Sequence, residues 1–142
     1  MGHEDAFDGA KLALFIGGKL AVILRDDIPE LPFAGYWDLP GGGREGAEGP
    51  LACALRECRE ELGLQVPEEA VTWQQRFTED GRVKWFFVAE QPSRIAEDIV
   101  FGDEGQCWTL MTPEEFLMHP KAVPAFQARL RLFLNPGRRD EV

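Results

Sequence analysis

The sequence has few cysteines, no long apolar run and no sign of a leader segment. The three cysteines, Cys53, Cys58 and Cys107, do not have the spacing of a metal-binding motif. The longest apolar runs, such as residues 12–16, are far too short to span a bilayer. Residues 1–10 lack the basic start and the apolar stretch of a signal peptide. We therefore expect a cytoplasmic protein with no membrane partner, in which the cysteines are free, buried thiols.

Positive charge is also scarce. Lys and Arg number 15 against 25 Asp and Glu, which gives a net charge of −10 at neutral pH. Binding to nucleic acid through its phosphates needs patches of Lys and Arg, so nucleic acid is not an expected partner. A small phosphorylated substrate remains compatible with an acidic surface. An acidic pocket that holds a polyanion, however, needs divalent cations as a bridge.

The length and composition indicate one globular unit. The 142 residues lie within the usual range for a single domain, and 44% of them are hydrophobic. The chain shows no internal repeat, no low-complexity tract and no linker. We expect a single domain over residues 1–142, with a frayed tail from about residue 135.

Two β-hairpins are predicted by pairs of apolar runs that flank short turns. The first turn is Gly17-Gly18 and the second is Asp80-Gly81. Residues 26–35 contain two prolines and are expected to form a loop. The Pro and Gly residues at 40–43 are expected to stop a short strand. The predicted strands cover residues 12–16, 20–24, 37–39, 71–78, 83–90 and 107–111.

Three helices are predicted from their start and stop signals. The first begins at Pro50 and ends before Gly63. The second begins at residues 112–115, where Thr is the N-cap, Pro comes first and Glu comes third. The third covers about residues 124–134, with an apolar stripe on one face. Residues 93–106 are expected to be irregular, and the order of elements predicts a mixed α/β fold without regular βαβ alternation.

The most informative segment is 42–64, which reads GGREGAEGPLACALRECREELGL. On a helical wheel, three carboxylates at spacings i, i+3 and i+4 share one face: Glu57, Glu60 and Glu61. The adjoining apolar face, expected to pack on the sheet, consists of Leu51, Leu55, Cys58 and Leu62. We place Arg56 and Arg59 on the opposite flank.

Three carboxylates within about one helical turn repel one another, and the stability of the fold does not require them. The arrangement suits a site for hard cations, because Mg²⁺ prefers a few carboxylate oxygens together with water and substrate phosphates. A metal held there could bridge to phosphate oxygens and help to generate a hydroxide nucleophile. The alternative is a solvated acidic helix face, and the wheel alone does not decide between the two.

The full spacing of the segment decides the matter. It reads G-x₅-E-x₇-R-E-U-x-E-E-x-G-U, where U is a bulky apolar residue. The pattern is met by Gly42, Glu48, Arg56, Glu57, Glu60, Glu61, Gly63 and Leu64. On these residues the segment resembles the Nudix box, and the chain is similar to the MutT/Nudix hydrolase family. Cys58 stands where relatives usually have Leu, Ile or Val, and a buried thiol packs as a small hydrophobic residue.

The resemblance extends beyond the box. Residues 37–42 are similar to the strand and loop that lead into the box in relatives. Residues 108–115 are similar to a strand-to-helix segment near the family's C-terminus. The implied fold is a single-domain α/β/α sandwich around a mixed β-sheet.

The resemblance also implies roles for the box residues. Relatives bind Mg²⁺, or Mn²⁺, on the box helix, so Glu60 and Glu61 should be the main metal ligands. Glu57 should ligate metal or orient the attacking water. Arg56 should fix a box glutamate through a charge-assisted hydrogen bond. Glu48 should assist through water or a second metal.

Three further residues are candidates for the site. The backbone carbonyl of Gly41 is a plausible extra metal ligand. Many relatives carry a late loop glutamate that acts as base or ligand, and Glu104 is the candidate here, with Asp103 as the alternative. Each of these two acidic residues could instead belong to an ordinary polar turn. Arg25 could contact phosphate or be an ordinary surface arginine.

Substrate identity lies outside the box. In relatives, a downstream proline marks ADP-ribose hydrolases and a tyrosine marks dinucleoside polyphosphate hydrolases. Residues 74–81 contain no proline, and the only tyrosine is Tyr36. This favours a compact substrate of the nucleoside triphosphate type. Several aromatic residues could stack on a base or lie in the core: Phe33, Tyr36, Trp37, Phe77 and Trp85.

The resemblance implies Mg²⁺-dependent hydrolysis of a diphosphate linkage in a nucleoside diphosphate derivative, namely a (d)NTP or damaged nucleotide, by attack of a metal-activated water on phosphorus. The alternative is a Nudix-fold module that binds a nucleotide as a sensor without turnover. The presence of every box glutamate favours the enzyme. Dimers are common in the family, so a homodimer is an open alternative to a monomer.

Overall fold

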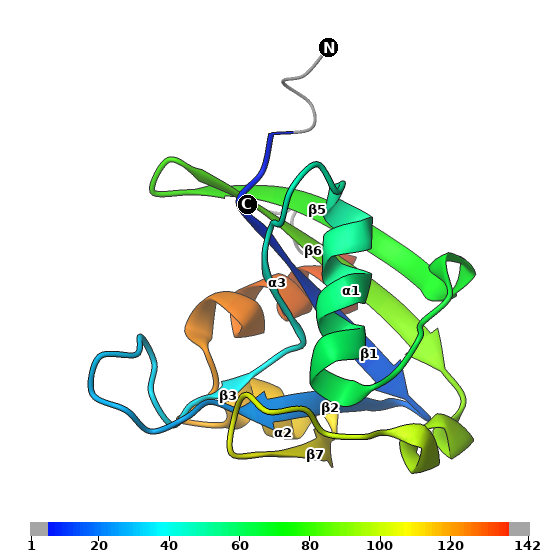
Figure 1. Cartoon of the computed structure of the whole chain (residues 1–142). Helices are drawn as coiled ribbons and strands as arrows, with labels where there is room; N and C mark the ends of the chain where they lie inside the picture. Colours follow the sequence, from blue (N-terminus) through cyan, green and yellow to red (C-terminus); the bar gives the residue numbers. More distant parts are fainter. Residues whose placement is uncertain (1–5, 137–142) are drawn as a thin grey trace.

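The structure is a computed structural model that describes residues 6–136, and within them seven strands form one mixed sheet (Figure 1). The main path of the sheet is β3-β2-β1-β6-β5, while β4 pairs with β1 and β7 pairs with β2. Strands β1 and β6 run parallel, and the other strand pairs are antiparallel. The strands are β1 (Gly9–Ile16), β2 (Lys19–Leu24), β3 (Trp37–Asp38), β4 (Gly41–Gly43), β5 (Val71–Glu79), β6 (Arg82–Gln91) and β7 (Cys107–Met111).

Helices cover both faces of this sheet, as Figure 1 shows for α1 on one side and α3 on the other. The first apolar layer packs α1 against residues of β1 and β6 such as Leu12, Leu14 and Phe87. The second layer packs α2 and α3 against residues of opposite parity, such as Ala13 and Phe86. The helices are α1 (Pro50–Leu62), α2 (Pro113–Met118) and α3 (Pro124–Leu134). This alternation along the strands produces the predicted α/β/α arrangement, which is confirmed.

Local signals were sufficient for the hairpins and helix ends. Asp80 and Gly81 have φ values of 52° and 76°, as a two-residue hairpin turn requires. Gly63 ends α1 with a φ of 69°, and its N–H donates to the carbonyl of Arg59 at 2.8 Å. The predicted capping box of α2 is present between Thr112 and Glu115. These predictions are confirmed.

Other expectations were wrong. Residues 41–43 do not merely stop a strand; they form β4, antiparallel to the start of β1. A Cβ at Gly41, whose φ is 137°, would lie 2.3 Å from the carbonyl oxygen of Ala10, so only glycine permits this close pairing. Residues 93–106 are not irregular throughout, because Ser93–Asp98 form a 3₁₀ helix. A further short 3₁₀ helix covers Glu68–Ala70.

The expectation about the thiols is correct in part. Cys53 and Cys58 are buried residues of α1, whereas Cys107 is exposed on β7. The apolar face of α1 is also rotated from the predicted one, because Cys53 and Ala54 are fully buried while Leu51 and Leu55 are only partly buried. The predicted frayed tail lies mostly outside the described residues. No helix in residues 6–136 is long and apolar enough to cross a membrane.

Candidate active site

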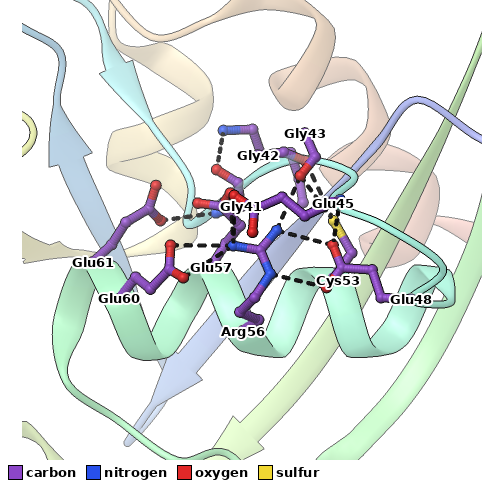
Figure 2. A network of polar contacts seen from close by, with 11 residues as sticks. Gly41, Gly42, Gly43, Glu45, Glu48, Cys53, Arg56, Glu57, Glu60 and Glu61 are labelled. Atoms are coloured by element: carbon purple, nitrogen blue, oxygen red, sulfur yellow. Dashed lines mark hydrogen bonds and ion pairs between the residues drawn. The ribbon is translucent and has the colours of Figure 1, made fainter.

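The loop between β4 and α1 folds the box back on itself, so that β4 lies beside the carboxylate face of the helix (Figure 2). Pro50 begins the helix at its first position. One residue before the helix ends, Glu61 accepts a hydrogen bond of 2.9 Å from the N–H of Gly41. A Cβ at Gly42 would lie 2.6 Å from the carboxyl carbon of Glu57. A side chain at position 42 would therefore displace the Glu57 carboxylate.

Arg56 is the centre of the polar network in Figure 2. Its Nε and Nη2 each donate to one oxygen of Glu48 at 2.9 Å. Its Nη1 donates to both oxygens of Glu60 at 3.1 Å, and Nη2 also donates to the carbonyl of Gly43 at 3.0 Å. Nη1 lies 3.4 Å from Glu57 Oε2. One guanidinium thus ties the loop before the helix to the acidic helix face.

The prediction that Arg56 lies on the opposite flank from the carboxylates was wrong. Residues four apart lie on the same side of a helix, so Arg56 and Glu60 are neighbours. The hydrogen bond from Arg56 to a box glutamate, which the family resemblance implied, is present with both Glu48 and Glu60.

The carboxylates of the network have different proton affinities. Hydrogen bonds from Arg56 lower the pKa of Glu48 to about 2. The same contacts raise the pKa of Arg56. Glu48 is therefore a fixed anion that holds Arg56, and it cannot act as a proton acceptor near neutral pH.

Glu57 and Glu61 show the opposite behaviour. Burial raises the pKa of Glu61 to about 7, although Lys11 and the hydrogen bond from Gly41 oppose this effect. Burial, with repulsion from Glu60, also raises the pKa of Glu57. These two carboxylates lie where the protein supplies too little positive charge to neutralise them.

A carboxylate cavity of about 300 Å³ lies over this face of α1. Its lining brings three box glutamates together with the loop that follows the 3₁₀ helix Ser93–Asp98. The lining consists of Glu45, Glu57, Glu60, Glu61, Asp103 and Glu104. The structure therefore places both late-loop candidates beside the box. Glu45, whose side chain is exposed and lies 3.7 Å from Arg56, was missed by sequence reasoning.

Two predicted ligands have other hydrogen-bond partners in the protein. Glu48 does not line the carboxylate cavity, and both its oxygens accept hydrogen bonds from Arg56. The carbonyl of Gly41 accepts a hydrogen bond of 3.1 Å from Lys11 Nζ. Lys11 also contacts Asp38 and was missed, although a lysine inside the apolar β1 run was a visible signal.

The donor set of the carboxylate cavity suits a hard divalent cation. Carboxylate oxygens are the ligands that Mg²⁺ and Mn²⁺ prefer, and burial raises the pKa of Glu57 and Glu61 in spite of nearby Arg56 and Lys11. In residues 6–136 no three Asp, Glu, His or Cys side chains already converge as a complete metal site. This is compatible with Mg²⁺, which usually binds one or two carboxylates and completes its shell with water and substrate phosphates.

A middle cavity of about 420 Å³ adjoins the carboxylate cavity and shares Glu61 and Glu104 with it. Arg25 lines the middle cavity, where its Nε donates to Asp38 at 2.9 Å and its Nη1 to the carbonyl of Pro32 at 2.7 Å. The apolar part of the lining consists of Ile23, Ile28 and Leu31. Arg25 is thus placed near the box glutamates, as a phosphate contact would require.

The aromatic candidates divide into two groups. Phe33 is exposed at the surface, with its ring 5.2 Å from that of Tyr36. Trp37, Phe77 and Trp85 are partly buried and pack against the core. None of the five lines the carboxylate cavity or the middle cavity.

Comparison with known proteins gives a consistent result. The model of the NUDIX domain family matches residues 12–132. Nucleoside triphosphatase NudI of Salmonella arizonae is 34% identical over 99 residues, which cover 61% of this chain and 69% of that relative. The MutT protein of Methanosarcina mazei aligns with a TM-score of 0.71 at 20% identity, covering 92% and 94% of the two chains. A C. elegans Ap4A hydrolase aligns with a TM-score of 0.68 at 18% identity, covering 88% and 94%.

Proposed function

The chain belongs to the NUDIX family of pyrophosphohydrolases, and we propose on this premise that it hydrolyses a nucleoside triphosphate between two phosphates with the help of Mg²⁺ or Mn²⁺. The observation that carries the proposal is the carboxylate cavity, in which Glu57, Glu60, Glu61 and Glu104 meet beside the Arg56 network. The name of the NudI relative supports a nucleoside triphosphate as the substrate class.

Glu57, Glu60 and Glu61 would hold the metal. A divalent cation supplies charge neutralisation for the diphosphate and lowers the pKa of an attacking water. Arg56 acts as a positioning residue, because it holds Glu60 by two hydrogen bonds and is itself held by Glu48. Gly41 positions Glu61 through its N–H.

Glu104 is the proposed general base, with Asp103 as the alternative. Both line the carboxylate cavity opposite the helix. In the reaction the base takes a proton from water, the water oxygen forms a bond to phosphorus, and the bridging phosphorus–oxygen bond breaks. The bond electrons leave with the departing phosphate, whose charge Arg25 could help to stabilise from the adjoining middle cavity.

The test is phosphate and pyrophosphate release from a panel of nucleotides with Mg²⁺. The panel contains dNTPs, 8-oxo-dGTP, ADP-ribose, dinucleoside polyphosphates and nucleotide sugars, with EDTA as a control. Glu60→Gln and Glu61→Gln should abolish turnover. Glu68→Gln is the matched control, because Glu68 is exposed in a 3₁₀ helix away from the cavity.

Turnover that survives both box substitutions would refute the site assignment. If nucleotides bind to the wild-type protein and none is consumed with Mg²⁺ or Mn²⁺, the sensor alternative replaces the enzyme.

A further inference from the structure

A basic pocket of about 360 Å³ lies on the face of the sheet that α3 covers, opposite α1. It is defined by four cationic residues in its lining: Lys11, Arg25, Lys84 and Arg129. The only acidic residue in the lining is Glu79, whose side chain is half exposed at 49%. In a chain with a net charge of −10, this concentration of positive charge has no counterpart in the other two cavities.

Arg129 brings unused hydrogen-bond donors to this pocket. It is only 7% exposed, and its guanidinium lies between the rings of Phe77 and Phe126, at 4.6 Å and 5.9 Å. Among the described residues, its one acceptor is Glu79, at 3.3 Å from Nη2. In residues 6–136, the only fully buried side-chain nitrogen or oxygen without a hydrogen-bond partner is Trp85 Nε1. The remaining donors of Arg129 are therefore not fully buried, and Arg129 lines the pocket.

Three further residues of the lining offer donors. Lys84 is half-buried on β6, and no described residue forms an ion pair or hydrogen bond with its ammonium. Arg25 uses Nε and Nη1 but has Nη2 left. Ala125 lies in the first turn of α3, where backbone N–H groups lack helical acceptors. Lys and Arg have no acceptor atoms at all.

The lining of the basic pocket contains residues that suit a flat ring. Glycines at 9, 42 and 43 form part of its wall without side chains. Phe126 also lines the pocket, but it is only 8% exposed, and its ring lies 5.3 Å from Lys11 Nζ and 5.9 Å from the Arg129 guanidinium. Phe33 also lines the pocket, is 45% exposed and has a φ of 54°, a conformation that costs a non-glycine residue energy. Aromatic rings of this kind stack on nucleobases.

The basic pocket is within reach of the proposed reaction centre. Gly42 lines the pocket and also contacts Glu57 of the carboxylate cavity. Arg25 lines both the basic pocket and the middle cavity, which in turn reaches Glu61 and Glu104. A nucleotide with its phosphates at the box could therefore place its base in the basic pocket.

We propose that the basic pocket holds the nucleobase of the substrate and that Lys84 and Arg129 select bases with carbonyl oxygens over bases with amino groups. The inference rests on the proposed function, since it concerns the nucleotide which that reaction consumes. A carbonyl oxygen accepts from the pocket's donors, whereas an amino group would face them with donors of its own. The mismatch leaves desolvated donors unpaired and should weaken binding about tenfold or more.

The experiment is calorimetric binding of nucleoside monophosphates to the full chain in EDTA, so that hydrolysis plays no part. dUMP is compared with dCMP, and IMP with AMP, because the members of each pair differ mainly by a carbonyl or an amino group at one position. The wild-type protein should bind dUMP and IMP about tenfold more tightly than their partners. Lys84→Gln should bring both ratios close to one, because glutamine supplies an acceptor as well as a donor.

Lys19→Gln is the matched control, since Lys19 is exposed at the start of β2 and does not line the basic pocket; it should preserve both ratios. Arg129→Lys keeps the charge of a buried residue and should lower the ratios without unfolding the protein, which circular dichroism can verify. Equal affinities in the wild type, or ratios that Lys84→Gln leaves unchanged, would overturn the proposal. Tight binding of inorganic phosphate that is lost in Lys84→Gln would overturn it too, by showing an anion site.

The outcome is separate from that of the hydrolysis test. Turnover without a carbonyl preference would refute only the role of the basic pocket. A carbonyl preference in binding without any turnover would refute catalysis and leave the pocket assignment intact.

Discussion

Arg56 and Glu48 form a bidentate ion pair, in which Nε and Nη2 of Arg56 each lie 2.9 Å from one carboxylate oxygen of Glu48. The remaining nitrogen of the guanidinium holds Glu60. Glu48 thus controls the position of Glu60, a proposed metal ligand, without lining the carboxylate cavity itself. A lysine could not reproduce this arrangement, because it offers a single point of charge where arginine offers a planar fork.

Arg56→Lys should therefore reduce kcat about 10- to 100-fold, with a smaller change in substrate KM. The dependence of rate on Mg²⁺ concentration should shift to higher concentrations, because Glu60 loses its fixed orientation. Arg59→Lys is the control, since Arg59 is exposed one turn from the C-terminus of α1. Unchanged kinetics in Arg56→Lys would show that the network serves stability alone.

The metal-free protein should lose stability as pH rises between about 4.5 and 7. Glu61 has its pKa raised from 4.5 to about 7 in the folded state, so the folded state binds more protons than the unfolded state in this range. Raising the pH then penalises the folded state, by on the order of 3 kcal/mol at most from this group. Urea unfolding at several pH values in EDTA measures the slope.

Glu61→Gln should flatten this dependence, and added Mg²⁺ should raise the stability of the wild type at pH 8 by mass action. Glu48 contributes in the opposite direction, because its pKa is lowered from 4.5 to about 2 in the folded state. Its stabilisation of the fold is fully present above pH 4.5 and is lost as the pH falls to about 2. A wild-type protein whose stability rises steadily from pH 5 to pH 8 in EDTA would contradict the placement of Glu61.

Gly42→Ala should abolish turnover and leave the fold intact. The added Cβ would lie 2.6 Å from the carboxyl carbon and Oε2 of Glu57, so the Glu57 carboxylate must shift from its position in the carboxylate cavity. Gly49→Ala is the control, because a Cβ there meets nothing within 4 Å. Circular dichroism and the hydrolysis assay together separate loss of function from loss of fold.

Glu104→Gln and Asp103→Asn distinguish the two candidates for the general base. Removal of a general base costs about 10²- to 10⁴-fold in rate, so the base variant should show a loss of this size in kcat. We expect the large effect for Glu104, which lines both the carboxylate cavity and the middle cavity, whereas Asp103 lines only the first. A larger loss in Asp103→Asn would exchange the two roles.

The predictable parts of the fold were those that local chemistry determines. The turn at Asp80-Gly81, the start of α1 at Pro50 and its end at Gly63 each depend on the conformational preferences of one or two residues. The family and the α/β/α arrangement followed from the spacing of the box, and both are confirmed.

The unpredicted parts depend on contacts between distant segments. The pairing of β4 with β1 involves three glycines of β4. Glycines show no alternation of apolar and polar side chains, which is the pattern that predicts a strand. The reach of Lys11 to the carbonyls of Leu39 and Gly41 depends on that same pairing. The basic pocket gathers residues from β1, the loop after β2, β4, β5, β6 and the start of α3, so no single stretch of sequence contains it.

Gly41 donates to Glu61 and accepts from Lys11, so one residue of a three-residue strand is bonded to both an acid and a base of the site. This makes the site sensitive to strand register. A slip of one residue exchanges the faces of a strand, and here it would separate both partners from Gly41 at once. Evolution can lengthen the loop at residues 26–36 without this penalty, but the stretch from Leu39 to Gly43 has to keep its length. Insertions in this fold should therefore alter which ligand is bound well before they alter the chemistry performed on it.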